Sequence, residues 1–234
     1  NHRGPMHAYT ISSASLSACP LFMQNQSLWQ SLLKQMHAYH LQKDEVIIHH
    51  GDPALRVWVV LNGWVKLHRQ TPDGKEAIVG LHGPGELFAE AALTSESPIY
   101  PYRAEALAHG TSCLAIPAEN LRRMMQKHPP LAGQLLALLH QRTYEVQLRL
   151  EQRTTMNAAQ RLGCFLLEQC KSNTTRHTLT LPIEKHVLAA YLGMKAETLS
   201  RSQAQLRTLG VTIRGTEVII DPIDRLRSFV CASC

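Results

Sequence analysis

The sequence predicts an α+β protein made of three successive parts: an antiparallel β-roll, one long helix, and a smaller helical unit closed by a β-hairpin. Three observations support this. Short apolar runs separated by turn residues fill positions 41 to about 116, apolar residues at helical spacing continue from 129 to about 154, and helical patterns followed by a hairpin make up the remainder. A chain of 234 residues is long enough for one large or two modest domains.

Turn signals define the β-rich region, expected over residues 19–128. Asn62-Gly63 and Pro72-Asp73-Gly74 separate apolar runs, and Gly and Asn accept the positive φ that tight hairpin turns need. This alternation predicts a small antiparallel barrel or roll. The segments expected as strands are 46–48, 57–61, 64–68, 77–79, Leu107 and 111–116.

One amphipathic helix is predicted over residues 129–156, after Pro129-Pro130. At 1.5 Å per residue it spans roughly 35–40 Å, too long to pack along its whole length on one small barrel. Part of its apolar stripe is therefore free to pair with a second copy through parallel helices, which predicts a homodimer. The alternative is a helix that lies entirely on its own barrel. The stripe consists of Leu136, Leu139, Thr143, Val146 and Leu150.

The region 157–234 has the layout of a winged helix-turn-helix. A helix from Asn157 and a short strand at 178–181 come first. Helices over 184–192 and 196–209 follow, broken at Gly193, and an alternating hairpin over 211–220 turns at Arg214-Gly215.

The net charge of +6 is unevenly distributed. Residues 1–152 carry 13 Lys and Arg against 12 Asp and Glu, whereas residues 153–234 carry 11 against 6. A basic C-terminal third beside a nearly neutral remainder predicts a polyanion-binding module, although charge does not separate DNA from RNA or phospholipid.

The second helix of the helix-turn-helix has a polar face in its first turns. Glu197, Ser200 and Arg201 lie on that face with Thr198 beside them, and this end of the helix meets base edges in such a module. Arg donates bidentately to guanine and Glu accepts from cytosine. The alternative is an exposed ion pair between positions 197 and 201 that only stabilises the helix. The cations expected to contact DNA phosphates are Lys195, Arg207 and Arg214.

These features together resemble the cyclic AMP receptor protein and FNR (CRP/FNR) superfamily of bacterial transcription regulators. The resemblance rests on the order of the parts, on Gly85-Glu-Leu-Phe-Ala-Glu-Ala-Ala-Leu93 and on Ala196-Glu-Thr-Leu-Ser-Arg201, and it covers about residues 19 to 227. It implies an N-terminal cyclic-nucleotide-binding-like roll that senses an effector, a dimerisation helix, and double-stranded DNA and RNA polymerase as partners. A Glu-x-x-Ser-Arg recognition helix implies TTGAT half-sites, here TTGAT-N4-ATCAA. Lys195 departs from the family, where Ser or Thr usually caps this helix.

The sensing end departs from the cyclic AMP binders it resembles. Those proteins hold the cyclic phosphate with an Arg-Ser pair that begins ten residues after a Glu. When that Glu is aligned with Glu90, Tyr100 and Pro101 occupy the positions of the Arg and the Ser. A phosphate needs a cation or several donors, so we do not expect cyclic AMP to bind. The family's effector position implies a pocket between the roll and the long helix. Its expected lining is Phe88, Ala89, Glu90, Tyr100, Tyr102, Leu135 and Leu138.

The cysteines exclude the iron–sulfur cluster of FNR itself, because Cys19 and Cys113 cannot supply four ligands. Phe88-Ala-Glu-Ala91 and Tyr100-Pro-Tyr-Arg-Ala-Glu105 resemble the Dnr and NnrR regulators of nitrogen-oxide respiration, which implies heme that binds nitric oxide or, as in CooA-type sensors, carbon monoxide. Thirteen histidines make heme ligation possible without selecting a ligand. The candidates in or beside the roll are His37, His40, His49, His50, His68, His82 and His109.

Other classes of protein are not supported. We find no Ser/His/Asp arrangement, P-loop or metal-ligand spacing, so an enzyme is not expected. No apolar run reaches the length of a membrane span, and residues 1–18 are expected to be a tag remnant and an arm around a native Met6, so the cytoplasm is the expected location. The dispersed cysteines are expected to be mostly reduced thiols, with Cys231 and Cys234 in a frayed tail rather than a metal or redox site.

Overall fold

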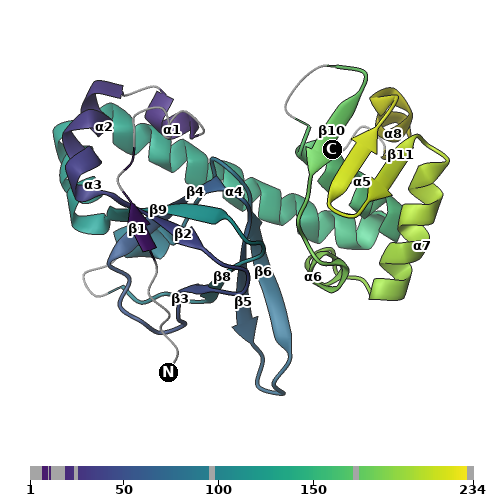
Figure 1. Ribbon diagram of the computed structural model, residues 1–234, viewed down its shortest axis with the longest axis horizontal. Helices are drawn as coiled ribbons and strands as arrows, with labels where there is room; N and C mark the ends of the chain where they lie inside the picture. The colour runs from purple at the N-terminus through teal and green to yellow at the C-terminus, as the bar shows by residue number, and fades with distance from the viewer. Residues whose placement is uncertain are drawn as a thin grey trace. The chain divides into compact units, whose positions relative to one another are not determined.

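The computed structural model describes residues 7–9, 11, 19–23, 26–94, 98–170 and 174–230. The chain forms two compact units, residues 1–141 and 142–234, and the boundary between them falls within one long helix, α4 (Pro129–Thr155) (Figure 1). The predicted helix over this segment is therefore confirmed. Each unit is described separately below.

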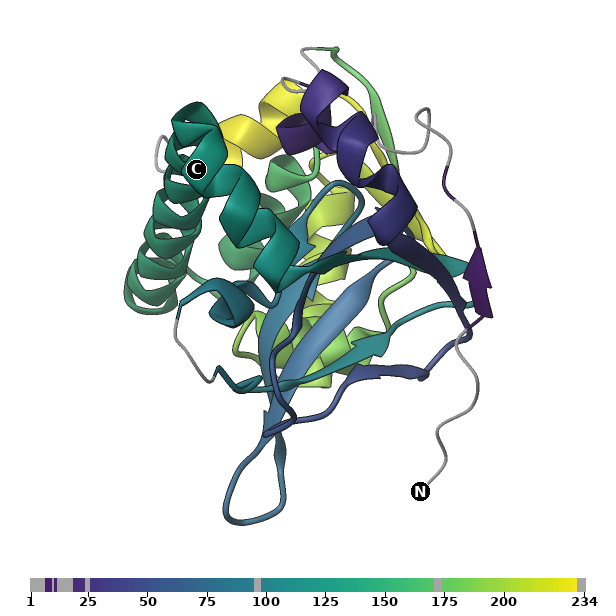
Figure 2. The same ribbon diagram turned by 90° about the vertical axis from the view of Figure 1, so that its left-hand side faces the viewer.

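The first unit is the predicted antiparallel roll. Its strands form two sheets with the orders β1-β2-β9-β4-β7 and β3-β8-β5-β6. In Figure 2 the hairpin of β5 and β6 extends well beyond the rest of the roll. The strands are β1 (His7–Tyr9), β2 (His37–Leu41), β3 (Val46–Ile48), β4 (Arg56–Asn62), β5 (Val65–Gln70), β6 (Glu76–His82), β7 (Leu87–Phe88), β8 (Arg103–Ala106) and β9 (Thr111–Pro117).

The predicted hairpin turns are present. Gly63, between β4 and β5, has φ +75°, and a Cβ there would lie 2.4 Å from Thr111 Oγ1, so both the backbone conformation and the space require glycine. Leu107 was expected in a strand, and this was wrong. Strand β8 ends one residue earlier, and the Leu107 N–H donates to the Trp64 carbonyl in the loop that follows.

Short helices cover the first sheet. Its core-facing residues Val57, Val59 and Leu114 are fully buried together with Leu131 and Leu135 of α4. Apart from α4, these helices were not predicted from the sequence, because most of them are too short to show a clear apolar period. They are α1 (Pro20–Met23), α2 (Gln26–Leu32), η2 (Leu33–Gln35), η3 (Glu90–Leu93) and α3 (Ala118–Lys127).

The face of the second sheet that points away from the core carries a partly buried ion-pair network. Lys66 Nζ lies 2.8 Å from Glu76 Oε1 and 3.2 Å from Glu105 Oε2, and His68 Nδ1 lies 2.7 Å from Glu76 Oε1. His68, Glu76 and Glu105 bring their ligand atoms close enough to hold a metal ion. The Lys66 ammonium, however, already forms ion pairs with both carboxylates. We therefore interpret the cluster as a structural network.

The second unit is the predicted winged helix-turn-helix. Asn157 and Gln160 form a reciprocal capping box at its first helix, which fixes where that helix begins. Its core contains the fully buried side chains of Leu162, Leu199 and Leu226. The elements are α5 (Ala158–Glu168), β10 (His177–Thr180), α6 (Lys185–Tyr191), α7 (Ala196–Arg207), β11 (Val211–Arg214), β12 (Glu217–Ile220) and α8 (Ile223–Val230), with the sheet order β10-β12-β11.

Among the described cysteines, Cys19, Cys113 and Cys170 are not disulfide-bonded, whereas Cys164 is, so the expectation of reduced thiols does not hold for Cys164. Burial raises the pKa of the Cys113 thiol, which therefore stays protonated. Cys231 and Cys234 lie outside the described residues. Among the helices that the structure describes, none combines the length and apolar character needed to cross a membrane.

Candidate DNA-binding surface and effector site

The second helix of the helix-turn-helix, α7, has one buried and one exposed side. Leu199 and Leu206 are fully buried, and the buried Ser202 hydroxyl donates to the Thr198 carbonyl at 2.9 Å. On the opposite side Glu197, Ser200 and Arg201 are exposed in the first turns. The three residues expected to meet base edges therefore share one accessible face of one helix.

The exposed ion pair offered as the alternative is not formed. Within the described residues, no salt bridge joins Glu197 to Arg201, and Arg201 Nη2 instead lies 3.5 Å from the hydroxyl of the half-buried Thr198. Lys195 is the N-cap of α7 and makes no side-chain cap hydrogen bond. Its ammonium is thus exposed at the positive end of the helix, where it contributes nothing to capping but can attract a phosphate.

The turn and the wing complete the basic surface. Gly193 in the turn between α6 and α7 has φ +66°, a conformation that favours glycine. The Met194 N–H donates to the Ala189 carbonyl and closes this turn. Arg214 ends β11 beside Gly215, and Arg207 lies in the last turn of α7; both arginines are exposed. The fold therefore presents each predicted phosphate-contacting cation at the surface of this one unit.

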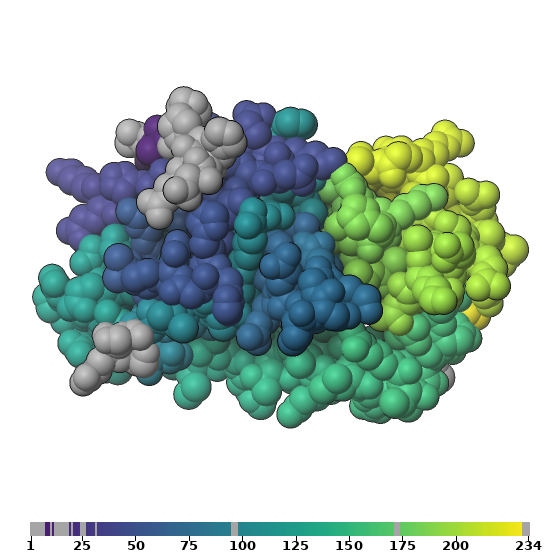
Figure 3. All heavy atoms as spheres, turned by 90° about the horizontal axis from the view of Figure 1, so that it is seen from below, coloured from purple at the N-terminus to yellow at the C-terminus, as the bar shows by residue number. Residues whose placement is uncertain are grey.

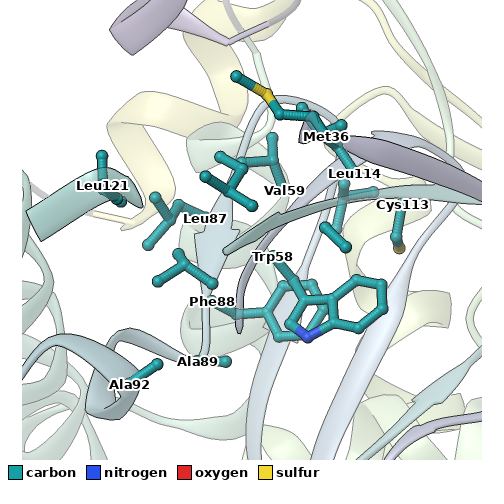
Figure 4. Close-up of a cluster of buried hydrophobic side chains, with 14 of the residues drawn as sticks. Met36, Trp58, Val59, Leu87, Phe88, Ala89, Ala92, Cys113, Leu114 and Leu121 are labelled. Carbon is teal, nitrogen blue, oxygen red and sulfur yellow. The ribbon is translucent and has the colours of Figure 1, made fainter. Parts of the chain in front are cut away.

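Most of the expected effector lining lies in the core of the first unit. Phe88, Ala89, Tyr100 and Leu135 belong to one buried cluster, and Tyr102 packs against it. Leu138 is half-buried and outside that cluster. Figure 4 shows Phe88 against the indole of Trp58, with Ala89 and Ala92 beyond it; the two rings are stacked with centroids 6.4 Å apart.

Both tyrosine hydroxyls of the expected lining are hydrogen-bonded to backbone. The Tyr100 hydroxyl donates to the Arg56 carbonyl at 2.9 Å and accepts from the Arg56 N–H at 3.2 Å. The Tyr102 hydroxyl accepts from the N–H of Ala89 at 2.8 Å, and Ala89 itself has φ +66°. Burial raises the pKa of Tyr100, so its hydroxyl remains neutral.

His82 was one of seven histidines predicted as candidates for heme ligation, and the sequence alone did not select it. Its ring stacks on Phe88 with centroids 5.8 Å apart, and its Nδ1 lies 3.4 Å from Glu86 Oε2. The ring packs closely on Gly80, because a Cβ at that position would lie only 3.0 Å from His82 Nε2. The signal available in the sequence was the alternation of β6, since Gly80 and His82 pair with Leu67 and Val65, which face the core.

The other histidines of the roll lie elsewhere. His37, His40, His49, His50 and His109 are exposed, and His68 lies between Glu76 and Glu105 in the ion-pair network. Of the candidates for heme ligation, His82 is therefore the one that contacts the expected effector lining through Phe88.

Sequence comparison agrees with both units. Residues 39–128 match the cyclic nucleotide-binding domain, and residues 160–229 match the Crp-like helix-turn-helix domain. A roll of the first type joined by a long helix to a DNA-binding domain of the second type defines a class of transcription regulator. The chain belongs to the CRP/FNR family.

Individual relatives support the FNR and Dnr side of the family. The transcriptional activator protein Anr of Pseudomonas aeruginosa is 30% identical over 190 residues, which cover 79% of this chain and 77% of Anr. The structure of DNR from Pseudomonas aeruginosa matches with a TM-score of 0.50 at 27% identity, covering 96% of this chain and all of that one. FixK2 from Bradyrhizobium japonicum matches with a TM-score of 0.73 at 25% identity, over 85% of this chain and 99% of FixK2.

Proposed function

We propose that the protein is a cytoplasmic, homodimeric transcription regulator that reads TTGAT-N4-ATCAA under the control of an effector held in its roll. The observation that carries the DNA specificity is the exposed triplet Glu197, Ser200 and Arg201 on α7. Arg201 donates to a guanine and Glu197 accepts from a cytosine, while Lys195, Arg207 and Arg214 position the unit on phosphates. RNA polymerase is the expected protein partner.

Exposed apolar side chains on α4 support the homodimer. Leu136, Val146 and Leu150 are 69%, 48% and 60% exposed, and they repeat at the spacing of one helical face together with Thr143 and the half-buried Leu139. Figure 3 shows teal-to-green atoms of the α4 region at the surface in that view. A second α4 laid parallel to the first would bury this stripe, as in a two-stranded coiled coil.

Fluorescence anisotropy with short duplexes tests the DNA assignment. Arg201→Ala is expected to lose about 1–3 kcal/mol of binding at the TTGAT site and to relax the preference at the contacted base pair. Arg225→Ala on α8 removes the same charge from an exposed position and is the matched control. The proposal fails if the wild-type protein binds TTGAT-N4-ATCAA and a scrambled duplex equally well at the same salt concentration.

Heme that binds nitric oxide or carbon monoxide is the effector system we propose to test first. His82 would hold the heme iron, because it is the candidate histidine whose ring stacks on Phe88 of the expected lining. Heme would supply a ferrous iron on which such a gas binds. We propose no iron–sulfur cluster, since Cys19 and Cys113 cannot supply the four thiolate ligands that such a cluster takes.

Titration with ferrous heme, read by visible absorption, tests this assignment. A stoichiometric Soret band that shifts with gas is expected for the wild type and for His109→Ala, which changes an exposed histidine. His82→Ala is expected to lose or shift the band. If no saturable band forms in the wild type, heme is excluded while the DNA-binding proposal stands.

The alternative effector is a cyclic nucleotide or another small molecule without heme. The match of residues 39–128 to the cyclic nucleotide-binding domain favours it. Against a phosphate ligand, Tyr100 and Tyr102 are already hydrogen-bonded to backbone, and Arg103 Nε donates to Glu105 Oε1 at 2.5 Å. Calorimetry with cyclic AMP is expected to give no heat of binding, and measurable affinity would favour this alternative.

A further inference from the structure

Side chains from the end of α4 contact the first helix of the helix-turn-helix. The Arg149 guanidinium donates from Nη1 to the Tyr191 hydroxyl and also lies over the Tyr191 ring, 5.1 Å from its centroid. The Tyr191 ring is held in turn by an edge contact with Phe165 of α5, with centroids 6.0 Å apart. One arginine of α4 is thus fixed to the last residue of α6 by a hydrogen bond and a cation–π contact.

Two more arginines converge on the same turn. Arg161 of α5 donates from Nε to the Leu192 carbonyl at 3.2 Å and from Nη1 to the Met156 carbonyl at 2.8 Å. The Arg153 guanidinium lies beside Gly193, where a Cβ would come within 3.1 Å of its Nε. Cations are favourable at a helix C-terminus, so these contacts stabilise the end of α6 and the turn into α7.

Polar contacts predominate in this part of α4. Between residues 142 and 155 only Gln152 is buried, so no fully buried apolar side chain fixes this end of α4 to the rest of the second unit. The backbone passes from α4 to α5 through Met156 and Asn157 alone. A connection this short can turn about few bonds, so the angle that the helix-turn-helix makes with α4 depends on the side chains that bridge the two.

We propose that Arg149 determines which spacing between DNA half-sites the protein accepts. This inference depends on the proposed homodimer and its palindromic site. In such a dimer the two α4 helices are paired, and the two recognition helices must lie about 34 Å apart to enter successive major grooves. Because α6 packs on α7, the Arg149–Tyr191 contact fixes the direction of each α7 relative to its own α4, and hence the distance between the two recognition helices.

The test compares binding to TTGAT and ATCAA half-sites separated by three, four and five base pairs. One base pair more or less rotates one half-site by roughly 35° about the DNA axis. The wild type is expected to bind the four-base-pair spacing about tenfold more tightly than the others, a difference typical of one disrupted position. Arg149→Ala is expected to reduce this preference to about threefold or less, because a freer helix-turn-helix accommodates the wrong spacing.

Three further variants separate positioning from charge and folding. Arg149→Lys keeps the charge but not the planar group that stacks on Tyr191, so it is expected to resemble Arg149→Ala. Tyr191→Phe keeps the ring and loses only the hydroxyl, so an intermediate preference is expected. Arg225→Ala, the charge-matched control, is expected to keep the wild-type spacing preference. A thermal unfolding transition checks that each variant is folded. If Arg149→Ala does not fold, the spacing preferences of Arg149→Lys and Tyr191→Phe decide the question.

The possible failures are distinguishable. A wild-type protein without any preference for the four-base-pair spacing overturns the proposed function itself. A wild-type preference that persists in Arg149→Ala and Arg149→Lys overturns the role of Arg149. Equal weakening of Arg149→Ala at all three spacings also overturns it, because that is the behaviour of a general phosphate contact.

Discussion

Replacing Glu105 by Gln is expected to destabilise the roll strongly at neutral pH. The Glu105 side chain is 11% exposed and lies within 3.4 Å of Lys66, His68 and Arg103. Burial alone would raise the pKa of Glu105, but the hydrogen bond with His68 and the charges of Lys66 and His68 outweigh it and lower the pKa from 4.5 to about 2. Glutamine keeps the shape but leaves these basic groups around a neutral amide.

The size of the effect follows from that pKa. A shift from 4.5 to about 2 corresponds to about 3 kcal/mol of stability at neutral pH. Because the pKa is lower in the folded state, this stability is present in full above about pH 4.5 and is lost as the pH falls toward 2. The Glu105→Gln protein lacks this contribution at every pH. The difference between the two proteins should therefore shrink with acid.

Urea unfolding followed by tryptophan fluorescence measures this directly, because the three tryptophans, Trp29, Trp58 and Trp64, all lie in the first unit. Titrations at pH 7, 5 and 3.5 give the free energy of unfolding of the roll for both proteins. Glu119→Gln, which removes an exposed carboxylate that pairs with surface arginines, is the control and is expected to change little. A Glu105→Gln protein as stable as wild type at pH 7, or equally destabilised at pH 3.5, refutes this explanation.

Other substitutions test other parts of the structure. Leu162→Ala, at a fully buried position of α5, should cost about 3 kcal/mol of unfolding free energy by circular dichroism, and a loss below about 1 kcal/mol would contradict its core position. Gly210→Ala should destabilise the second unit, because Gly210 has φ +90° and a Cβ there would lie 2.1 Å from the Asp221 carbonyl oxygen; an unchanged melting temperature would show that this strain is relieved. Leu150→Asp should shift the protein toward monomer in sedimentation equilibrium, whereas Glu151→Asp should not; dimers of unchanged stability would place the interface elsewhere.

Local sequence signals predicted the parts of the fold that depend on local rules. Gly63 and Gly74 have the positive φ expected of them in hairpin turns, and Gly193 and Gly215 have it in the helix-turn-helix and the wing. The long helix followed from leucine spacing alone. The short helices α1 and α2 did not, because segments of four and seven residues contain too few turns to show a period.

The candidate sites were predictable to different degrees. The face of α7 follows from helical periodicity, so Glu197, Ser200 and Arg201 could be assigned to one surface from the sequence. The surroundings of the effector lining depend on pairing between distant strands. The contact of His82 with Phe88 requires the pairing of β6 with β5 and of β7 with β4, and the bond from Tyr100 to the Arg56 backbone joins residues 44 positions apart. Tertiary packing sets such contacts, and the alternation of β6 indicates only the side of the strand on which His82 lies.

Selection of bound duplexes from a random library tests the DNA specificity most directly. The purified protein is incubated with random 20-base-pair duplexes at fixed salt, and the retained DNA is sequenced over several rounds. The expected result is enrichment of TTGAT and ATCAA as inverted repeats four base pairs apart, with Arg201→Ala losing the selected guanine position. Enrichment of an unrelated motif, or of none, would contradict the assignment of α7 as a reader of TTGAT half-sites.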